Sequence, residues 1–164
     1  LWGRAEKARD AFINAPQTMQ VFCGCDMRFL HGARTALLEY VTPGHIWCSA
    51  DSLTVACCDF MAFLPSQAVS DFFAQAARHC ERYGFADDQV ATNDDKFRLR
   101  AMLRLLPKIF WTHGIAENSP GVWDGADIAV LPPAPNGMVM HHANFTIGAE
   151  NKMRLLDFYA KAAK

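Results

Sequence analysis

Several classes of protein are excluded by what this sequence lacks. No apolar run approaches the roughly 20 residues that a helix needs to cross a bilayer. The 16 lysine and arginine residues are balanced by 17 aspartate and glutamate residues, and no basic run marks a surface for nucleic acid. Low-complexity tracts and internal repeats are also missing. We therefore expect no membrane span in this chain and no nucleic-acid partner.

The spacing of the six cysteines does not match a structural zinc motif. Cys23 and Cys25 are separated by one residue, and Cys57 and Cys58 are adjacent, whereas structural zinc sites use Cys-x2-Cys pairs. Four of the six lie in apolar, strand-like runs, where cysteine behaves as a small hydrophobic side chain. We expect mostly buried free thiols, and the spacing leaves one or two disulfides or a zinc site open as alternatives.

The composition is that of a folded globular domain. Hydrophobic residues make up 51% of the 164 residues and charged residues 20%, which suffices for a substantial core in one domain spanning residues 1–164. The chain opens with Leu1 rather than with Met, and we expect it to be a piece of a longer protein.

Helix-like and strand-like patterns alternate along the chain. One helix is predicted between Ser66 as N-cap and Gly84 as stop. The other expected helices span residues 4–15, 33–41, 96–106 and 150–163. The expected strands span residues 19–23, 45–49, 53–64, 109–112, 128–131 and 138–142. This alternation predicts an α/β sandwich around a mixed sheet, with ligands at the carboxyl ends of the strands.

Polar residues follow the first and the last predicted strands. Asp26 follows the first and His142 ends the last, and a carboxylate with a neutral imidazole suits Mn²⁺, with Mg²⁺ or Zn²⁺ as alternatives. Two protein ligands leave coordination positions that a diphosphate can fill. Lys152 would neutralise a leaving diphosphate, and Gly148 would let the backbone approach it closely. These residue types predict a transferase that breaks a sugar–phosphate bond.

Three blocks of the sequence resemble the nucleotide-diphospho-sugar transferase family, a group of GT-A-fold glycosyltransferases that includes plant cell-wall arabinosyl- and xylosyltransferases. Residues 21–30 resemble its hydrophobic strand leading into Asp-x-Asp, and residues 88–93 resemble its Asp-Gln followed by Asn. The most specific block resembles its closing His-x-Asn, Gly and Lys, and consists of His142, Asn144, Gly148 and Lys152. The resemblance covers roughly residues 7–158.

The resemblance implies a GT-A-like, Rossmann-like α/β/α sandwich with a mixed central sheet, truncated at its N-terminus. It implies a glycosyltransferase that moves a hexosyl or pentosyl group from a nucleotide-diphosphate sugar to a glycan or glycoprotein acceptor. The expected cofactor is Mn²⁺ or Mg²⁺, held by Asp26 and His142. The secretory pathway, in particular the Golgi lumen, is the expected location.

The resemblance also assigns residues to the reaction. Asp87 and Asp88 are the expected catalytic residues near the acceptor, although either could simply cap a helix. The expected substrate-binding residues are Gln89, Asn93, Asn144, Gly148 and Lys152. Gln89 and Asn93 lie on one helical face, where both can reach one ligand or bond to each other.

One departure from the family pattern leaves a second function open. Gly24 stands where the family has the first aspartate of Asp-x-Asp, and only Asp26 is kept. The alternative is therefore a non-catalytic GT-A-like relative that binds carbohydrate or a partner. A Cys/His metal module is a third hypothesis, and it requires convergence of Cys23, Cys25, His141 and His142.

Overall fold

The computed structural model describes residues 2–15, 17–52, 54–85, 87–112, 123–127 and 131–163. Its helices are α1 (Trp2–Asn14), α2 (Ala33–Tyr40), α3 (Gln67–Tyr83), α4 (Asp88–Asn93) and α5 (Ala149–Ala162), with a short 3₁₀ turn at Arg100–Met102. Its strands are β1 (Gln20–Cys23), β2 (Met27–Phe29), β3 (Ile46–Ala50), β4 (Ala56–Phe63), β5 (Leu103–Leu105), β6 (Phe110–Thr112) and β7 (Met140–His142). None of the helices in the described part of the chain is both long and apolar enough to cross a membrane.

The strands form two mixed sheets, which confirms the α/β class. One sheet has the order β1-β4-β3-β5, with β3 and β5 parallel and the other pairs antiparallel. The other has the order β2-β7-β6, with β6 and β7 parallel and β2 antiparallel to β7. The prediction of one central sheet is wrong, because backbone hydrogen bonds divide the described strands between two sheets.

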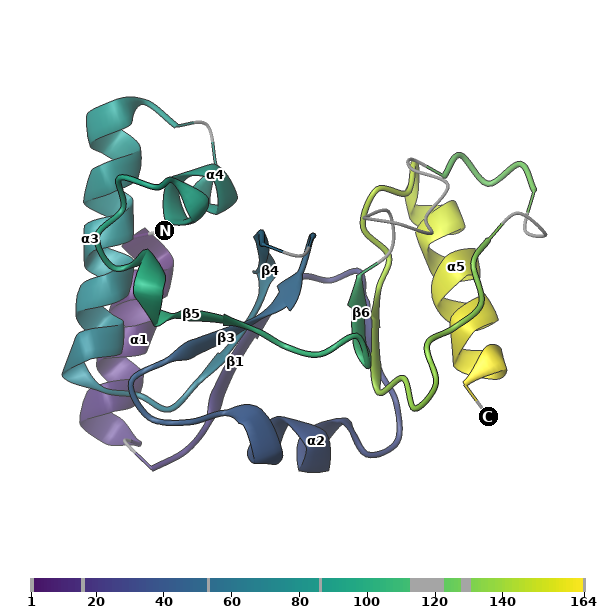
Figure 1. Ribbon diagram of the computed structural model, residues 1–164, viewed down its shortest axis with the longest axis horizontal. Helices are drawn as coiled ribbons and strands as arrows, with labels where there is room; N and C mark the ends of the chain where they lie inside the picture. Colours follow the sequence, from purple (N-terminus) through teal and green to yellow (C-terminus); the bar gives the residue numbers. More distant parts are fainter. Residues whose placement is uncertain are drawn as a thin grey trace.

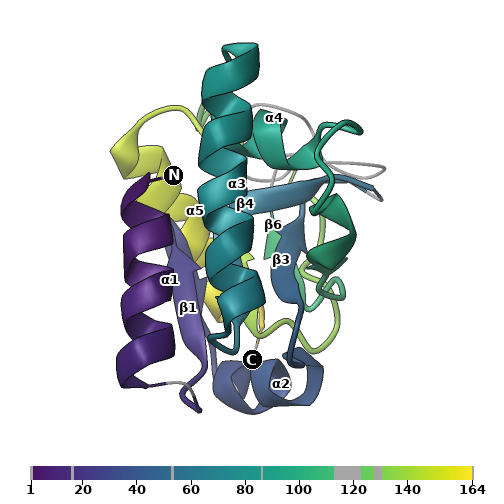
Figure 2. The same cartoon turned by 90° about the vertical axis from the view of Figure 1, so that its left-hand side faces the viewer.

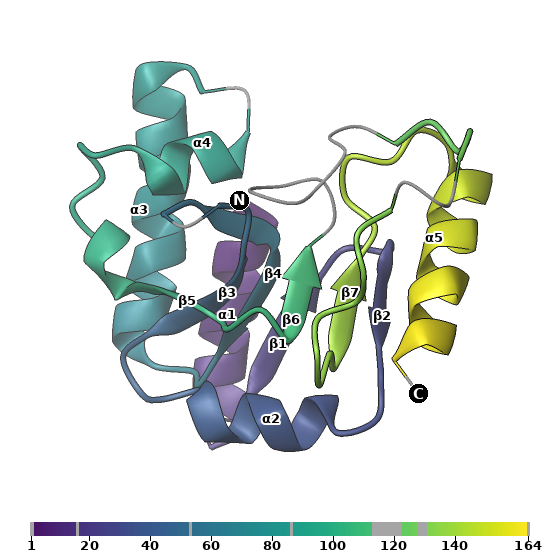
Figure 3. The same ribbon diagram turned by 45° about the vertical axis from the view of Figure 1, so that its right-hand side comes forward.

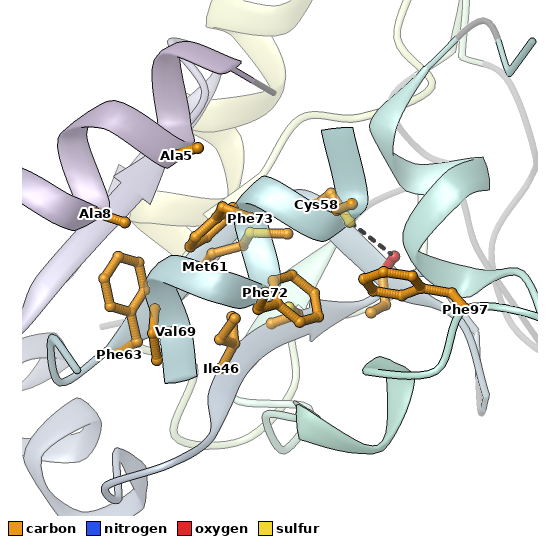
Figure 4. Close-up of a cluster of buried hydrophobic side chains, with 13 residues drawn as sticks. Ala5, Ala8, Ile46, Cys58, Met61, Phe63, Val69, Phe72, Phe73 and Phe97 are labelled. Carbon is orange, nitrogen blue, oxygen red and sulfur yellow. Dashed lines mark hydrogen bonds between the residues drawn. The ribbon is translucent and has the colours of Figure 1, made fainter. Parts of the chain in front are cut away.

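Helices cover the outer side of each sheet (Figure 1). Helices α1 and α3 lie side by side against the four-stranded sheet (Figure 2), whereas α5 lies beside the three-stranded sheet (Figure 3). The core under α1 and α3 is aromatic: Phe63, Phe72 and Phe73 pack with Met61 (Figure 4). Because these side chains are fully buried, this core is the main source of hydrophobic stabilisation for the four-stranded sheet.

A second apolar cluster joins the two sheets. Phe60 of β4 stacks on Phe110 of β6 with ring centroids 6.4 Å apart, and Met140 of β7 belongs to the same cluster. Leu37 of α2 closes it from one end. The cluster holds β7 close to β4, although the two strands belong to different sheets.

Helix α3 has the boundaries that the sequence predicts. The Ser66 hydroxyl accepts a hydrogen bond from the Val69 amide at 3.2 Å, which caps the helix. Gly84 ends the helix with a φ of 65°, a left-handed conformation that glycine adopts without strain. The buried stripe between these two residues packs against the sheet, as its 3.6-residue period requires.

The helix predicted over residues 96–106 is wrong. Residues 100–102 form one 3₁₀ turn, and β5 then pairs in parallel with β3, with Leu103 opposite Ile46 and Leu105 opposite Cys48. The open edge of β3 supplies hydrogen-bond partners that a helix over this segment would leave unused. The edge strand predicted over residues 128–131 lies, except for its last residue, outside the described residues.

Candidate functional site

Antiparallel pairing of β2 with β7 brings Asp26 and His142 together. Met27 is opposite His142, and the Ala143 amide donates to the Asp26 carbonyl at 2.9 Å. Asp26 lies in the turn between β1 and β2, so its side chain stands beside the last residue of β7. Its Oδ1 is 3.3 Å from His142 Nε2. Two residues that are 116 positions apart, 142 minus 26, thus share one site.

The imidazole of His142 is completely buried, and its Nε2 is not satisfied by a hydrogen bond. Within the described residues Nε2 has no partner that meets the distance and angle required of a hydrogen bond, and its nearest carboxylate oxygen is Asp26 Oδ1 at 3.3 Å. The carboxylate of Asp59 lies on the same side, with Oδ2 3.9 Å from Nε2. The other ring nitrogen, Nδ1, faces Cys57 Sγ at 3.8 Å. A buried imidazole nitrogen that faces two carboxylates without a hydrogen bond is a candidate ligand atom for a cation.

Lys152 completes the cluster from the first turn of α5. Its Nζ donates to Asp26 Oδ2 at 2.5 Å, while Oδ1 of the same carboxylate faces His142. A cation is disfavoured at the start of a helix unless an anion lies nearby, and Asp26 is that anion here. The lysine was predicted to bind a diphosphate, and in the structure it binds this carboxylate.

The environment keeps Asp26 ionised. Contact with His142 is the largest cause that lowers the pKa of Asp26 below its ordinary value of 3.8, and contact with Lys152 adds to it. These two effects outweigh burial, which acts in the opposite direction. By contrast, burial raises the pKa of Cys57 to about 12, so that the thiol beside His142 stays protonated near neutral pH.

Asn144 extends the cluster toward Asp51. Its Nδ2 donates to Asp51 Oδ1 at 3.4 Å, and its Oδ1 accepts from the Phe145 amide at 3.0 Å. Asp51 is only 4% exposed, and its Oδ2 accepts a short hydrogen bond from Gln89. Gln89 and Asn144, both predicted to bind substrate, therefore meet on one buried carboxylate. In the sequence, Asp51 had only the pattern of a turn residue, and nothing there indicated this role.

The backbone conformation of Gly148 favours glycine. A Cβ at this position would meet no protein atom within 4 Å, and close approach of the backbone to a diphosphate stays a prediction. Its φ of 85° with a ψ of 143° is a conformation that side chains make very costly. Gly148 turns the chain into α5 and thereby sets the direction from which Lys152 reaches Asp26.

The amides of α4 bind the backbone of β4. The Asn93 side chain accepts from the Ala56 amide and donates to the Ala56 carbonyl, both at 2.9 Å. Gln89 Oε1 accepts from the Cys58 amide at 3.2 Å. Strand β1 pairs with β4 only as far as Phe60. The two predicted substrate-binding residues of α4 thus supply hydrogen bonds to the part of β4 that precedes Phe60. Their hydrogen-bonding groups are directed at protein atoms.

Asp87 and Asp88, the predicted catalytic residues, also bind within the protein. The Asp87 carboxylate accepts from the Val90 amide at 2.8 Å and caps α4. Asp88 forms an ion pair with Arg4 at 2.7 Å, and Arg4 also donates to the Cys58 carbonyl at 2.8 Å. An open depression of about 360 Å³ lies beside α4, between Val55 and Phe85, and none of its lining residues belongs to the Asp26 cluster.

His141 and the tryptophans lie away from the cluster. His141 is buried against the rings of Trp111 and Tyr159, with centroids 5.1 Å and 4.5 Å away. It therefore faces α5 and does not converge with His142, as the Cys/His metal module would require. Trp123 is buried in the core that contains Tyr159.

The cysteines of the described chain are free thiols. Cys48, Cys57 and Cys58 are buried as expected, whereas Cys23 and Cys25 are exposed. Among the described residues no three or more histidine, cysteine, aspartate or glutamate side chains form a ready-made metal cluster. Comparisons of this chain with family models, curated proteins and solved structures give no match.

Proposed function

We propose that this chain is a metal-dependent glycosyltransferase domain with a GT-A-like fold. It would transfer a sugar from a nucleotide-diphosphate sugar to a glycan or glycoprotein acceptor. The observation that carries the proposal is the convergence of Asp26, His142 and Lys152 from three separate segments. The α/β architecture with helices outside mixed sheets is compatible with it.

The donor atoms of Asp26 and His142 fit a divalent cation. Bonds of about 2.1 Å at right angles place two ligand atoms about 3.0 Å apart, and a slightly wider angle gives the observed 3.3 Å. Because Nε2 makes no well-formed hydrogen bond, a cation would satisfy a buried polar atom. A carboxylate with an imidazole suits Mn²⁺, with Mg²⁺ as an alternative.

Each residue has a distinct role in the proposed transfer. When bound, the cation would act as a Lewis acid that stabilises negative charge on a diphosphate leaving group. Asp26 and His142 hold the site through Oδ1 and Nε2. Lys152 is on the other side of the same carboxylate, where its ammonium group can bind a phosphate oxygen in place of Oδ2. Asp51 and Asn144 fix the loop that follows His142.

Calorimetric titration of uridine diphosphate, with and without Mn²⁺, tests the proposal. We expect binding by the wild type only with Mn²⁺, and loss of that binding in His142→Ala. His31→Ala is the matched control, because His31 is exposed. Circular dichroism confirms folding of each variant, and Lys152→Met serves as a second variant because Lys152 is partly exposed. Failure of the folded wild type to bind in Mn²⁺ contradicts the proposal.

One observation favours the alternative, a non-catalytic relative that binds carbohydrate or a partner. The charge of Asp26 is already neutralised by Lys152, and position 24 lacks the first carboxylate of Asp-x-Asp. A protein of this kind would bind an oligosaccharide with no requirement for Mn²⁺ and no response to His142→Ala. Titration of a glycan panel under both conditions separates the two functions.

A further inference from the structure

A second carboxylate, that of Asp59, faces the same imidazole nitrogen as Asp26. Its Oδ2 lies 3.9 Å from His142 Nε2, and its side chain is 54% exposed. Asp59 is the one charged residue in the apolar strand β4. Burial of the neighbouring residues stabilises the strand, whereas a lone carboxylate contributes nothing to that packing. Its place beside a buried nitrogen without a hydrogen bond points to a ligand.

A bulge in β4 directs Asp59 toward the site. Pairing with β3 moves from Cys48 opposite Met61 directly to Ser49 opposite Cys57, so residues 58–60 of β4 have no partner on β3. On the other edge of β4, the Gly24 amide donates to the Asp59 carbonyl at 2.9 Å. Bulges of this kind redirect side chains and are frequent beside functional sites.

Side chains of α4 and α1 bind the backbone of β4 at the bulge. Asn93 binds the backbone of Ala56, and Gln89 binds the amide of Cys58. Arg4, paired with Asp88, binds the carbonyl of Cys58. Because the backbone is fixed at residues 56 and 58, the alternate residues Cys57 and Asp59 remain directed at His142. The α4 residues would thus position a ligand without contacting the cation.

Gly24 stands directly beside this carboxylate. A Cβ at position 24 would lie 3.0 Å from Asp26 Oδ1 and 3.8 Å from Asp59 Cβ. A carboxylate carried by residue 24 and one carried by residue 59 would therefore reach the same region. We propose that Asp59 supplies the carboxylate that position 24 lacks, so that Asp26, Asp59 and His142 together bind one divalent cation.

The chemistry of the three donors agrees with this assignment, which rests on the proposed function. Two carboxylate oxygens and one imidazole nitrogen suit Mn²⁺, and two negative charges neutralise a dication. Rotation of the exposed Asp59 side chain would bring Oδ2 from 3.9 Å to about 3.0 Å from His142 Nε2, the separation of two neighbouring ligand atoms on one cation. With both carboxylates on the cation, the Lys152 ammonium is available for a phosphate.

Binding of Mn²⁺ alone, followed through the electron paramagnetic resonance signal of free Mn²⁺, tests the role of Asp59. We expect Asp59→Asn to weaken Mn²⁺ binding by about tenfold or more, in the range of changes seen when groups that support a metal are removed. Asp10→Asn is the matched control, since it removes the same charge from an exposed position on α1 and should leave binding within about twofold.

A rescue variant separates ligation from a general charge effect. Gly24→Asp placed in Asp59→Asn returns a carboxylate to the same region and should restore most of the lost affinity. Position 24 does not have a positive φ, so an L side chain is allowed there, and only the 3.0 Å contact with Asp26 needs a small adjustment. Gly24→Ala in the same background adds the Cβ without the charge and should restore nothing.

The outcomes distinguish this inference from the proposed function. If the wild type binds Mn²⁺ and Asp59→Asn binds it equally well while His142→Ala does not, the role of Asp59 is overturned and the two-ligand site stands. If the wild type binds no Mn²⁺ at millimolar concentration, the three-ligand site is overturned. The uridine diphosphate titration then decides the proposed function separately.

Discussion

Beside His142 the polar side chains face one another, whereas along α4 they face the backbone of β4. In the first region, a buried imidazole nitrogen makes no hydrogen bond within the described chain and two carboxylates lie nearby, one of them half exposed. In the second region, the Asn93 amide uses both its ends on Ala56, and Gln89 joins Cys58 to Asp51. Both regions carry residues that were predicted from the sequence to bind the metal or the substrate.

The difference separates two uses of polar residues. Amide groups that are fully paired with backbone groups stabilise a strand and have little left to offer a ligand. Carboxylate and imidazole groups that are close together and incompletely satisfied gain from a bound cation. We infer that α4 mainly stabilises the backbone of β4, and that the proposed cation site is formed by the residues around His142. Substitutions at Asn93, Asp26 and Asp87 test whether the two regions differ in this way.

The largest expected effect on stability comes from Asn93→Leu. The change removes three hydrogen bonds and leaves the Ala56 amide and carbonyl without their partner. We expect the free energy of unfolding to fall by about 3 kcal/mol, because unpaired buried backbone groups cost about 1–3 kcal/mol each. Urea unfolding measures this loss.

The matched control for Asn93→Leu is Asn14→Leu. Asn14 is exposed on α1 and makes one side-chain hydrogen bond within its own helix, so a change within about 0.5 kcal/mol is expected. Equal stability of the Asn93 and Asn14 variants, with a loss of nucleotide binding only in Asn93→Leu, would show instead that Asn93 binds substrate.

A smaller effect, dependent on pH, is expected for Asp26→Asn. The pKa of Asp26 is lower in the folded protein than its ordinary value of 3.8, so its contribution is fully present above about pH 5 and is lost as the pH falls through the folded value. Since the Lys152 partner is partly exposed, we expect the variant to lose about 1 kcal/mol near neutral pH.

Urea unfolding of the wild type and Asp26→Asn across the acid range checks this sign. The difference between the two proteins should narrow as the pH falls below about 4, where the unfolded protein binds a proton at Asp26 before the folded protein does. A difference that stays constant or widens below about pH 4 would contradict an ionised Asp26 in the folded state.

The smallest effects are expected at Asp87. Asp87→Ala removes the cap of α4 and should lower the free energy of unfolding by about 1 kcal/mol, whereas Asp87→Asn should change it little because asparagine caps equally well. Once a donor and an acceptor are identified, turnover by Asp87→Asn is the decisive measurement. Full turnover would assign Asp87 to capping, and loss of turnover at unchanged stability would restore its catalytic assignment.

Helix α3 and the apolar strand β4 were predicted well because their signals are local. Ser66 and Gly84 bound α3 by cap chemistry, and the 3.6-residue stripe between them has a single interpretation. The segment 103–105 was mispredicted because its conformation depends on the edge of β3, more than 50 positions earlier in the sequence. Asp59 was detectable in the sequence as a lone carboxylate in an apolar strand. The direction of its side chain, however, depends on the bulge in β4.

Asp26, His142 and Lys152 are recognisable in the sequence as candidate site residues, because they follow strands or lie in the first turn of a helix. The α/β class is also evident there, because hydrophobic periods are local. The folded structure was needed to show that Lys152 binds Asp26, that Asp51 joins Gln89 to Asn144, and that Asp59 lies beside Gly24. Each of these contacts joins segments whose distance in space is set by sheet pairing and core packing, and a sequence pattern does not contain that distance.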